Sequence, residues 1–389
     1  MLSYLLRNKR WPIGLDVGTD SIKMLQMQRV GGSLGVCACA RWRFPPSTPD
    51  ASAERRAVAA SAIHQILRCG NFRGRSVNSV LSGDQLAIRN VRLPQMPDHE
   101  LKEALLWEAK ERFDFDVTPD RLYYLNAGEL RQGAETSQEI ILMAARAEVV
   151  EDHLKLLEEA GLRPEHVEAE PVALFRIFER FLRRQADEEA VTVVVDIGLS
   201  STRVVVARGR RILFVKSINI AGRRFNDAVA KQLNLSAEEA AELRTRLMRE
   251  AESQPVGQGP DGGGEPRRDS INWSVHDALR AEAEALAREI ALCLRYCLVT
   301  FRGIRSKTVT VTGGQAYDPA LIELLGRNLN LDCVAGRPLR YVDVSAVDLG
   351  ADRRGMMSEW AVCAGLAIRD IDVQSELQGS QHGDARLSA

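Results

Sequence analysis

The chain has 389 residues, of which 45% are hydrophobic, and a chain of this size is expected to form two or three domains with separate cores. Its 52 Lys and Arg residues nearly balance its 53 Asp and Glu residues, so its net charge does not favour binding to nucleic acid or to an anionic membrane. Seven cysteines without a Cys-x-x-Cys pair argue against a disulfide framework and a tetrathiolate zinc site.

The N-terminal segment, MLSYLLRNKRW, is interrupted by charge too early for a signal peptide or a membrane-spanning helix. No run of about 18 apolar residues occurs elsewhere, so we expect a cytoplasmic protein. Two interpretations of this segment stay open. One is a short amphipathic foot on a membrane, and the other is a frayed terminus, which is the simpler because so short a helix is marginal.

The first half of the sequence predicts alternating strands and helices. Strand-like runs (IGLDV, IKMLQMQ, VNSVLSG and LAIRNVRL) flank a helical stretch at 53–69. Pro94 and Pro97 then precede an amphipathic helix at 98–113, with Asp98 as its expected N-cap. A small α+β insertion is predicted next, with strands at RLYYLNAG and QEIILMAA and a helix at 147–160.

The second half begins with three predicted strands joined by tight turns, VTVVVDIGLSSTRVVVARGRRILFVKSINI. Helices at 223–233 and 237–249 should lead into a Gly/Pro-rich mobile loop at 250–270. A helix at 273–301, a strand TVTVTGG, a helix near Leu321 and a helix at 358–368 complete the pattern. Cys293 and Cys297 share one face of the long helix without a nearby histidine, so we expect them in the core.

One hairpin motif occurs twice. Asp16 and Asp196 are 180 positions apart, and aligning them superposes IGLDVGTDSIKMLQM on VVVDIGLSSTRVVVA. Each copy reads as an apolar strand, Asp-x-Gly, a small polar turn, a basic residue and a second apolar strand. The repeat opens each half of the chain and therefore predicts two homologous lobes.

The residues of both hairpins suit phosphate and Mg²⁺. Gly18 and Gly198 permit tight turns whose amides point at phosphate oxygens. Asp16 and Asp196 are expected to face one another between the lobes and to hold Mg²⁺ through water. Lys23 adds an ammonium group, and further donors are the hydroxyls of Thr19, Ser21, Ser200, Ser201 and Thr202.

A third motif supports this interpretation, because a single Asp-x-Gly hairpin is more often an ordinary polar turn. Gly313 and Gly314 end a predicted strand and precede a helix. Without a Cβ, backbone at such a position packs flat against a nucleobase and ribose. The matched hairpins together with this Gly-Gly turn favour a nucleotide clamp.

These motifs resemble those of the actin/Hsp70/sugar-kinase superfamily, which implies an actin-like, ribonuclease-H-like α/β fold of two lobes. Within it the chain is similar to the PilM family of type IV pilus assembly proteins, itself related to FtsA. The likeness to PilM is carried by VRLPQMPDHELKEALLWEAKERFDFDVTPDRLYYL, EPVALFRIF and AGRRFNDAVAKQLNLSAEEAAELR. The first of these resembles the start of the inserted 1C subdomain of that family.

The resemblance implies a domain organisation. A first lobe at 1–90 and 165–190 holds a 1C-type insertion at 91–164; a second lobe at 191–221 and 305–370 holds a 2B subdomain at 222–304, and a disordered tail follows at 371–389. It also implies that ATP and Mg²⁺ are bound. Around the phosphates it places Asp16, Gly18, Thr19, Asp20, Ser21, Lys23, Asp196, Gly198, Ser200, Ser201 and Thr202; around the adenosine it places Gly222, Glu242, Gly313, Gly314 and Gln315.

Two positions depart from the family pattern: Arg244 stands where relatives often carry Lys near the ribose, and Arg223 replaces the second glycine of a usual Gly-Gly pair.

The resemblance implies a partner too, the cytoplasmic N-terminal peptide of the inner-membrane protein PilN, in a platform that also contains PilO and PilP. The protein is then expected at the cytoplasmic face of the inner membrane. Self-association and the choice between a pilus and a type II secretion system stay open.

Two enzyme-like alternatives compete with this interpretation. A carbohydrate or small-molecule kinase of the same superfamily needs a carboxylate base, for which Asp84 is the candidate, although a polar turn explains that residue more simply. A chaperone ATPase is disfavoured by the short polar tail.

Glu168 and Glu170, near the connection between the halves, are expected in solvent, where a carboxylate would at most orient a hydrolytic water. No catalytic residue is assigned, and at most slow ATP hydrolysis is expected.

Overall fold

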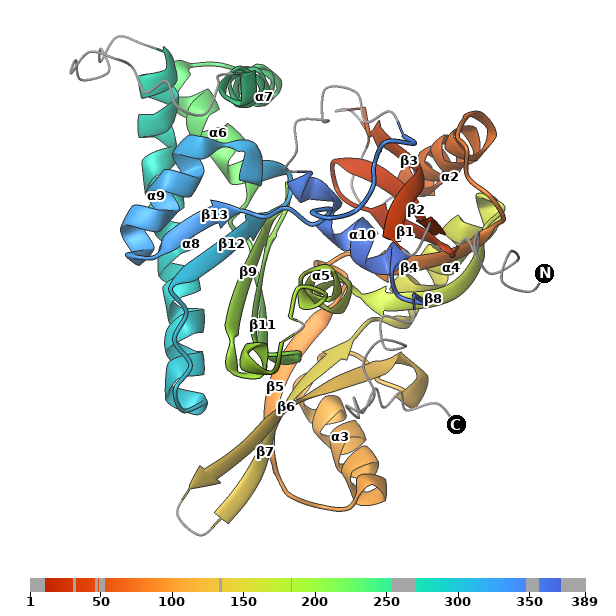
Figure 1. The fold of residues 1–389 in the computed structure, drawn as a ribbon, viewed down its shortest axis with the longest axis vertical. Coiled ribbons are helices and arrows are strands. Elements are labelled where there is room, and N and C mark those ends of the chain that lie inside the picture. The colour runs from red at the N-terminus through yellow and green to blue at the C-terminus, as the bar shows by residue number, and fades with distance from the viewer. Residues whose placement is uncertain are drawn as a thin grey trace.

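Two five-stranded sheets with the same strand order form the two lobes of the protein (Figure 1). The computed structural model describes residues 11–30, 33–45, 48, 53–132, 135–182, 184–253, 271–347 and 357–371. In space, the first sheet runs β3 (Ser33–Arg43), β2 (Ser21–Val30), β1 (Ile13–Val17), β4 (Ser76–Leu81), β8 (Arg163–Ala169). The second sheet runs β11 (Arg211–Ile218), β10 (Thr202–Arg208), β9 (Val191–Ile197), β12 (Thr308–Thr312), β13 (Asp332–Ala335).

The pairing within the two sheets is also the same. In each lobe the first three strands form an antiparallel meander, and two parallel strands continue the sheet from the first of them. The valine runs of β9 and β10 are buried, as expected of strands covered on both faces. The duplicated topology agrees with the duplicated hairpin of the sequence.

A third sheet of three strands is inserted into the first lobe, below the other two in Figure 1. Its order is β5 (Ala87–Pro94), β7 (Glu135–Ala144), β6 (Leu122–Gln132). Helix α3 (Asp98–Arg112) covers it and buries Leu105 and Ala109 in their own core cluster. Asp98 was expected to cap this helix, but Pro97 occupies the N-cap and no side chain caps it. Pro97 is extended, so Asp98 becomes the first helical residue, where its charge still favours the helix dipole.

The remaining helices are α2 (Ala53–Cys69), α4 (Ala147–Glu159), α5 (Glu170–Glu179), α6 (Gly222–Leu233), α7 (Ala237–Ser253), α8 (Ile271–Thr300), α9 (Pro319–Leu329) and α10 (Ala361–Ala367). Short 3₁₀ turns lie at Pro119–Arg121, Gln185–Glu189, Gly314–Tyr317 and Ser358–Trp360. Helices α2 and α4 share a core with the first sheet, and α8 packs on β10 and β11. Cys293 and Cys297 of α8 are buried in the larger core, as predicted.

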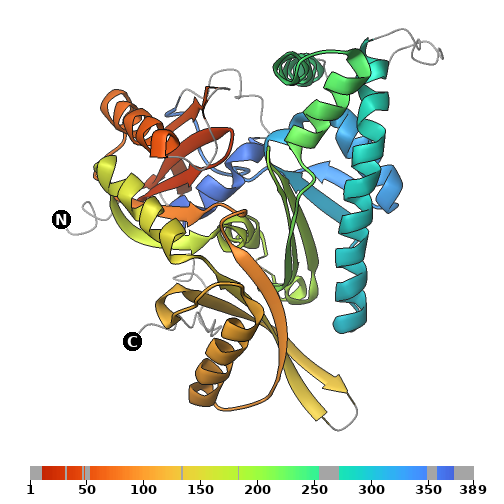
Figure 2. The ribbon, with the colours of Figure 1, turned by 180° about the vertical axis from the view of Figure 1, so that it is seen from behind.

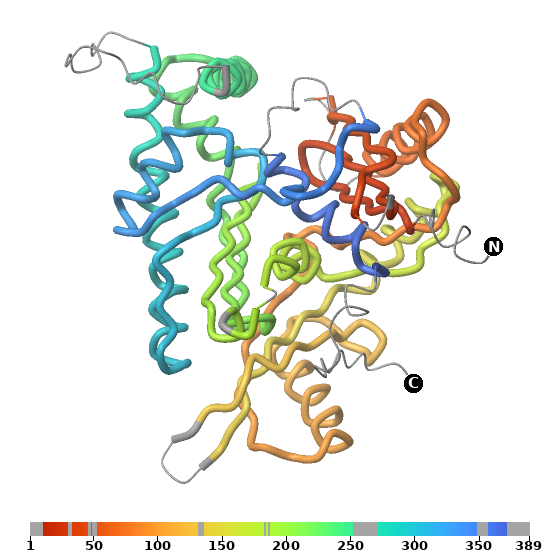
Figure 3. Tube along the Cα trace, in the orientation of Figure 1, coloured from red at the N-terminus to blue at the C-terminus, as the bar shows by residue number. Residues whose placement is uncertain are grey.

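Helices α5 and α10 lie between the two lobes, side by side in Figure 1 and in the view from behind (Figure 2). Helix α5 carries the chain from β8 of the first lobe to the second. After the second lobe, α10 packs on β1 of the first, and the tube in Figure 3 follows both passages. The lobes are therefore joined by two helices in direct contact.

Several sequence-based expectations fall outside the described residues: the N-terminal segment before Trp11, most of the mobile loop expected at 250–270 and, after its first residue, the tail expected at 371–389. Helix α7 extends to Ser253, past the predicted end at 249. Among the helices that the structure describes, none is long and apolar enough to span a membrane.

Acidification is expected to destabilise the first lobe through His153 of α4. The ring lies 2.9 Å from the Ser79 hydroxyl, and burial lowers its pKa to about 4. Between about pH 6.5 and 4 the unfolded chain takes up a proton that the folded chain does not, so stability falls by up to about 1.4 kcal/mol per pH unit. Urea unfolding across this range should show a smaller loss for His153→Gln, whose amide still reaches Ser79.

The exposed His64 of α2 provides the control for this experiment. His64→Gln should keep the acid-dependent loss of the wild-type protein. Equal pH dependence in wild type and His153→Gln would show that other groups cause the loss.

Candidate functional site

The two repeated hairpins bring their turns together at the junction of the lobes. The Gly18 amide donates to the Ser21 carbonyl over 3.0 Å, and the Gly198 amide donates to the Ser201 carbonyl over 3.1 Å. The turns thus have equivalent hydrogen bonds. The hydroxyls of Thr19 and Ser200, one from each turn, are hydrogen-bonded at 2.8 Å. Residues 181 positions apart therefore connect the lobes at the tips of the predicted phosphate turns.

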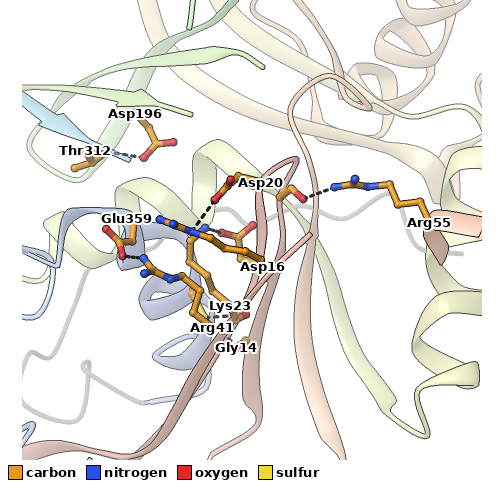
Figure 4. A network of polar contacts seen from close by, with 12 residues as sticks. Gly14, Asp16, Asp20, Lys23, Arg41, Arg55, Asp196, Thr312 and Glu359 are labelled. Atoms are coloured by element: carbon orange, nitrogen blue, oxygen red, sulfur yellow. Dashed lines mark hydrogen bonds and ion pairs between the residues drawn. The ribbon is translucent and has the colours of Figure 1, made fainter. Parts of the chain in front are cut away.

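Both aspartates of the repeat lie at this junction, each with a different partner (Figure 4). Lys23 Nζ donates to Asp16 Oδ2 over 2.9 Å within the first hairpin. Asp196 accepts a hydrogen bond of 2.8 Å from the hydroxyl of Thr312, which lies on the neighbouring strand β12. The end of β12 is thereby bound to the second hairpin, which places the Gly313–Gly314 turn beside it.

The charges at the junction influence one another. Burial raises the pKa of Asp196, and the nearby Asp16 carboxylate raises it further, while Thr312 and Lys23 oppose the shift. Burial alone would lower the pKa of Lys23, but the Asp16 carboxylate outweighs it and the pKa is raised. Two carboxylates that repel one another beside a firmly charged lysine form a site that favours an added cation and an anion together.

The residues present fit a Mg²⁺-bound phosphate group. Asp16 and Asp196 offer the carboxylate oxygens that Mg²⁺ prefers, and this ion commonly keeps several water ligands. Among the described residues no group of three or more His, Cys, Asp or Glu side chains is placed to enclose a metal. Two carboxylates alone suit an ion that takes its other ligands from water and phosphate.

The predicted nucleoside side of the site is built around Gly222 and Gln315. The Gly222 amide donates to the Gly198 carbonyl over 3.0 Å, which ties the start of α6 to the second turn. A Cβ at Gly222 would lie 2.6 Å from Gln315 Nε2. Gly313 has φ of +85°, and a Cβ there would lie 2.4 Å from the Ile197 carbonyl oxygen, so this turn requires glycine. Gly314 is exposed, and a Cβ there would meet no atom within 4 Å.

Arg244 is part of this region, and both terminal nitrogens of its guanidinium donate to protein groups. It is 3% exposed and donates to Gln315 Oε1 at 2.8 Å and Asp318 Oδ2 at 3.0 Å. It also donates to Asn226 Oδ1 at 2.8 Å. The guanidinium thus orients the Gln315 amide.

Four of the predicted site residues have side chains that are buried against the protein or exposed to solvent. The buried Thr202 hydroxyl donates to the Ile220 carbonyl over 2.6 Å, and Ser21 is also buried. Asp20 is exposed and lies 3.6 Å from Arg43. Glu242 is exposed on α7. Ser21 and Thr202 support the turns, and Asp20 lies within the first turn.

The structure adds residues that no sequence motif assigns to the site. Arg55 of α2 donates to the carbonyls of Gly18 and Thr19, over 3.1 and 2.6 Å, and holds the first turn from outside. Glu359, in the 3₁₀ turn before α10, pairs with Arg41 of β3. Basic residues near a turn are common in any sequence, so no local pattern singles out Arg55 or Arg41.

Glu168 and Glu170 were expected in solvent, but both carboxylates are bound to arginine side chains. Glu168 is buried and accepts from Arg176 at 2.7 Å. Glu170 pairs with Arg203 at 3.3 Å, and burial raises its pKa to about 7, aided by the Asp196 and Asp16 carboxylates and opposed by Arg203. Both carboxylates sit where α5 leaves the first lobe, a buried position that the polar sequence around them did not suggest.

Asp84, the candidate kinase base, lies in the loop between β4 and β5. Its side chain is exposed, and Oδ1 accepts a hydrogen bond of 2.7 Å from the Ser82 hydroxyl. This contact is typical of a polar turn.

A family model described as type IV pilus assembly protein PilM matches residues 14–251. The chain is also similar to a solved structure described as the PilM-PilN type IV pilus biogenesis complex. That structure has a TM-score of 0.73 and 26% identity, over 92% of this chain and 98% of that chain.

Two other solved structures show the same fold at lower identity. The ethanolamine utilization protein EutJ from Carboxydothermus hydrogenoformans is 12% identical, with a TM-score of 0.52 over 92% of this chain and 89% of that chain. MreB5 of Spiroplasma citri, bound to ADP, is 10% identical, with a TM-score of 0.50 over 94% and 98% of the two chains. The predicted actin-like fold of two lobes is confirmed.

Proposed function

The chain belongs to the family of type IV pilus assembly protein PilM, and we propose that it is the nucleotide-binding component of a pilus or related type II secretion assembly platform. The observation that carries this proposal is the meeting of two glycine turns from different lobes, joined by Thr19 and Ser200. A ligand with several phosphates spans such a junction. The similar Spiroplasma MreB5 structure is bound to ADP, which supports a nucleotide as that ligand.

The proposed ligand is ATP with Mg²⁺. Backbone amides of the turns at Gly18 and Gly198, with the Thr19 and Ser200 hydroxyls, would hold the phosphates. The ion would supply positive charge between phosphates and the carboxylates of Asp16 and Asp196. The remaining nucleoside contacts would come from Gly222, Gly313, Gly314 and Gln315.

Nucleotide binding would favour the closed arrangement of the lobes. A ligand that contacts both lobes binds the closed state better than an open one and so shifts the population toward it. The contacts that would change on opening are those that cross the junction, such as Thr19 with Ser200. The α5–α10 contact would serve as the hinge.

The proposed partner is the cytoplasmic N-terminal peptide of a PilN-type membrane protein. The likeness to the PilM-PilN complex supports it. This docking would place the protein at the cytoplasmic face of the inner membrane through its partner, with PilO- and PilP-type proteins as indirect neighbours. The inserted subdomain, carried on the first lobe, is the proposed docking side.

Calorimetry tests both halves of this proposal. We expect purified protein to bind a non-hydrolysable ATP analogue with Mg²⁺ and a synthetic PilN-type N-terminal peptide. Each ligand should change the affinity of the other by the same factor, about fivefold or more, because coupling between two sites is reciprocal. Absence of binding to both ligands would show that the proposal is wrong.

For the kinase alternative, the contact seen at the candidate base is that of a polar turn: the exposed Asp84 carboxylate accepts from the Ser82 hydroxyl. Robust phosphorylation of a sugar or small acid would nevertheless favour it over an assembly role.

A further inference from the structure

Arg203 occupies the same position in the second hairpin as Lys23 does in the first. The two are 180 residues apart, and each is the cross-strand neighbour of its own aspartate, Lys23 of Asp16 and Arg203 of Asp196. Their ion pairs differ, however. Lys23 binds Asp16 within its hairpin, whereas Arg203 leaves its lobe and binds Glu170 at the start of α5. The base of the second hairpin therefore makes its ion pair with α5 and not with the aspartate of its own hairpin.

The contacts of Arg203 join three parts of the molecule. Its Nη2 donates to the Ser201 hydroxyl of the second phosphate turn at 3.2 Å, and its Nε and Nη2 lie 3.3 and 3.4 Å from Glu170 Oε2. Its Nη1 donates to the Ser217 hydroxyl of β11. The side chain is only 2% exposed. A buried guanidinium is stable only with such partners, so this one is tightly held.

The fourth neighbour of Arg203 is Gly83, in the loop that connects β4 to β5. A Cβ on Gly83 would lie 1.1 Å from Nη2 and 1.6 Å from Cζ of Arg203. The guanidinium of the second lobe therefore lies directly against the backbone of the first, in a place that only glycine leaves free. Shortly after Gly83, at Ala87, β5 begins the sheet of the inserted subdomain.

We propose that Arg203 is a positioning residue that couples the second phosphate turn to the root of the inserted subdomain. A phosphate seated at Ser201 moves that hydroxyl, Arg203 moves with it, and the Gly83 loop must follow because no free space separates them. The β5 strand also packs against β11, which carries Ser217. This inference rests on the proposed nucleotide binding. It identifies the contacts through which a bound nucleotide would affect the inserted subdomain, the proposed docking side.

Two substitutions from opposite lobes test the coupling. Arg203→Lys keeps the charge but cannot span Ser201, Ser217 and Glu170 at once, and Gly83→Ala displaces the guanidinium without removing it. Arg208→Lys, on the same strand but bonded to the Arg302 carbonyl, is the control. Hydrogen–deuterium exchange of β5 and β7 is measured with and without Mg²⁺ and a non-hydrolysable ATP analogue, whose affinity is measured separately by calorimetry.

In wild type and Arg208→Lys, the analogue should slow exchange in β5 and β7. Both test variants should lose this response while binding the analogue within about tenfold of wild type, the range expected for one altered hydrogen bond. A retained response in Gly83→Ala, or complete loss of analogue binding by a folded Arg203→Lys protein, would overturn the coupling role. Wild-type protein that binds the analogue without any response would overturn it too, whereas wild-type protein that binds no analogue would remove the proposed function itself.

Discussion

Substituting alanine for Gly365 is expected to lower the free energy of unfolding by about 3 kcal/mol, at the upper end of what overpacking usually costs. Gly365 lies in α10, where a Cβ would be 1.8 Å from the carbonyl oxygen and 2.7 Å from the carbonyl carbon of Ala173 in α5. Both atoms belong to backbone, so no side chain can rotate away. Alanine also favours helix by about 1 kcal/mol relative to glycine, but this gain is smaller than the cost of separating the helices.

Gly326 of α9 provides the matched control, because it is also a helical glycine but its added Cβ would approach no atom closer than 3.3 Å. Urea unfolding of Gly326→Ala should stay within about 1 kcal/mol of wild type. If Gly365→Ala is equally stable, the two helices between the lobes do not cross as closely as described, and their role as a fixed hinge is wrong.

The parts of the fold that the sequence predicts are local. The hairpin β1–β2 and the meander β9–β11 follow from short apolar runs joined by short turns, and the repeat of one motif indicates the second lobe. The edge strands β8 and β13 were not predicted, because RPEHVEA and DCVA are short and partly polar. Their partners β4 and β12 lie elsewhere in the chain, so only the assembled sheet makes them strands.

In the candidate site, too, the sequence predicts the features that lie within one hairpin and misses the contacts between the lobes. The turn glycines, with Asp16 and Asp196, are found from sequence because the backbone of each hairpin presents them together. The Thr19–Ser200 contact joins residues from different lobes, and no pattern within either hairpin contains it. The likeness of Arg203 to Lys23 is visible in the aligned repeat. Its pairing with Glu170 depends on what the other lobe places opposite.

The sequence also does not show which polar side chains near the site are free to contact a ligand and which are hydrogen-bonded to other protein groups. A hydroxyl in a turn predicts a phosphate donor, but the Thr202 hydroxyl donates to the Ile220 carbonyl. The resemblance puts Arg244 near the expected ribose as a departure from the family pattern, and in the structure its guanidinium is hydrogen-bonded to Asp318 and Gln315. A side chain turns inward when a buried acceptor needs a donor, and this need appears only in the packed structure.

The largest expected effect on ligand binding is that of Lys23→Met, which should weaken binding of ATP with Mg²⁺ by about 30-fold or more. Removing one partner of a desolvated charge pair typically costs about 2–5 kcal/mol, and each 1.4 kcal/mol is about tenfold in affinity. Lys23 and Asp16 are both 13% exposed. Without Lys23, the repulsion between the Asp16 and Asp196 carboxylates, and between them and the phosphates, loses its nearest compensating ammonium.

Lys216→Met is the matched control for this experiment, measured by calorimetry at the same excess of Mg²⁺. Lys216 makes an ion pair of similar length, 2.8 Å, with Glu289, but its side chain is 39% exposed and the pair joins β11 to α8 away from the turns. Such pairs contribute little, so affinity should stay within about threefold of wild type. If Lys23→Met also stays within this range while remaining folded, Lys23 serves only to neutralise Asp16, and the phosphates bind without it.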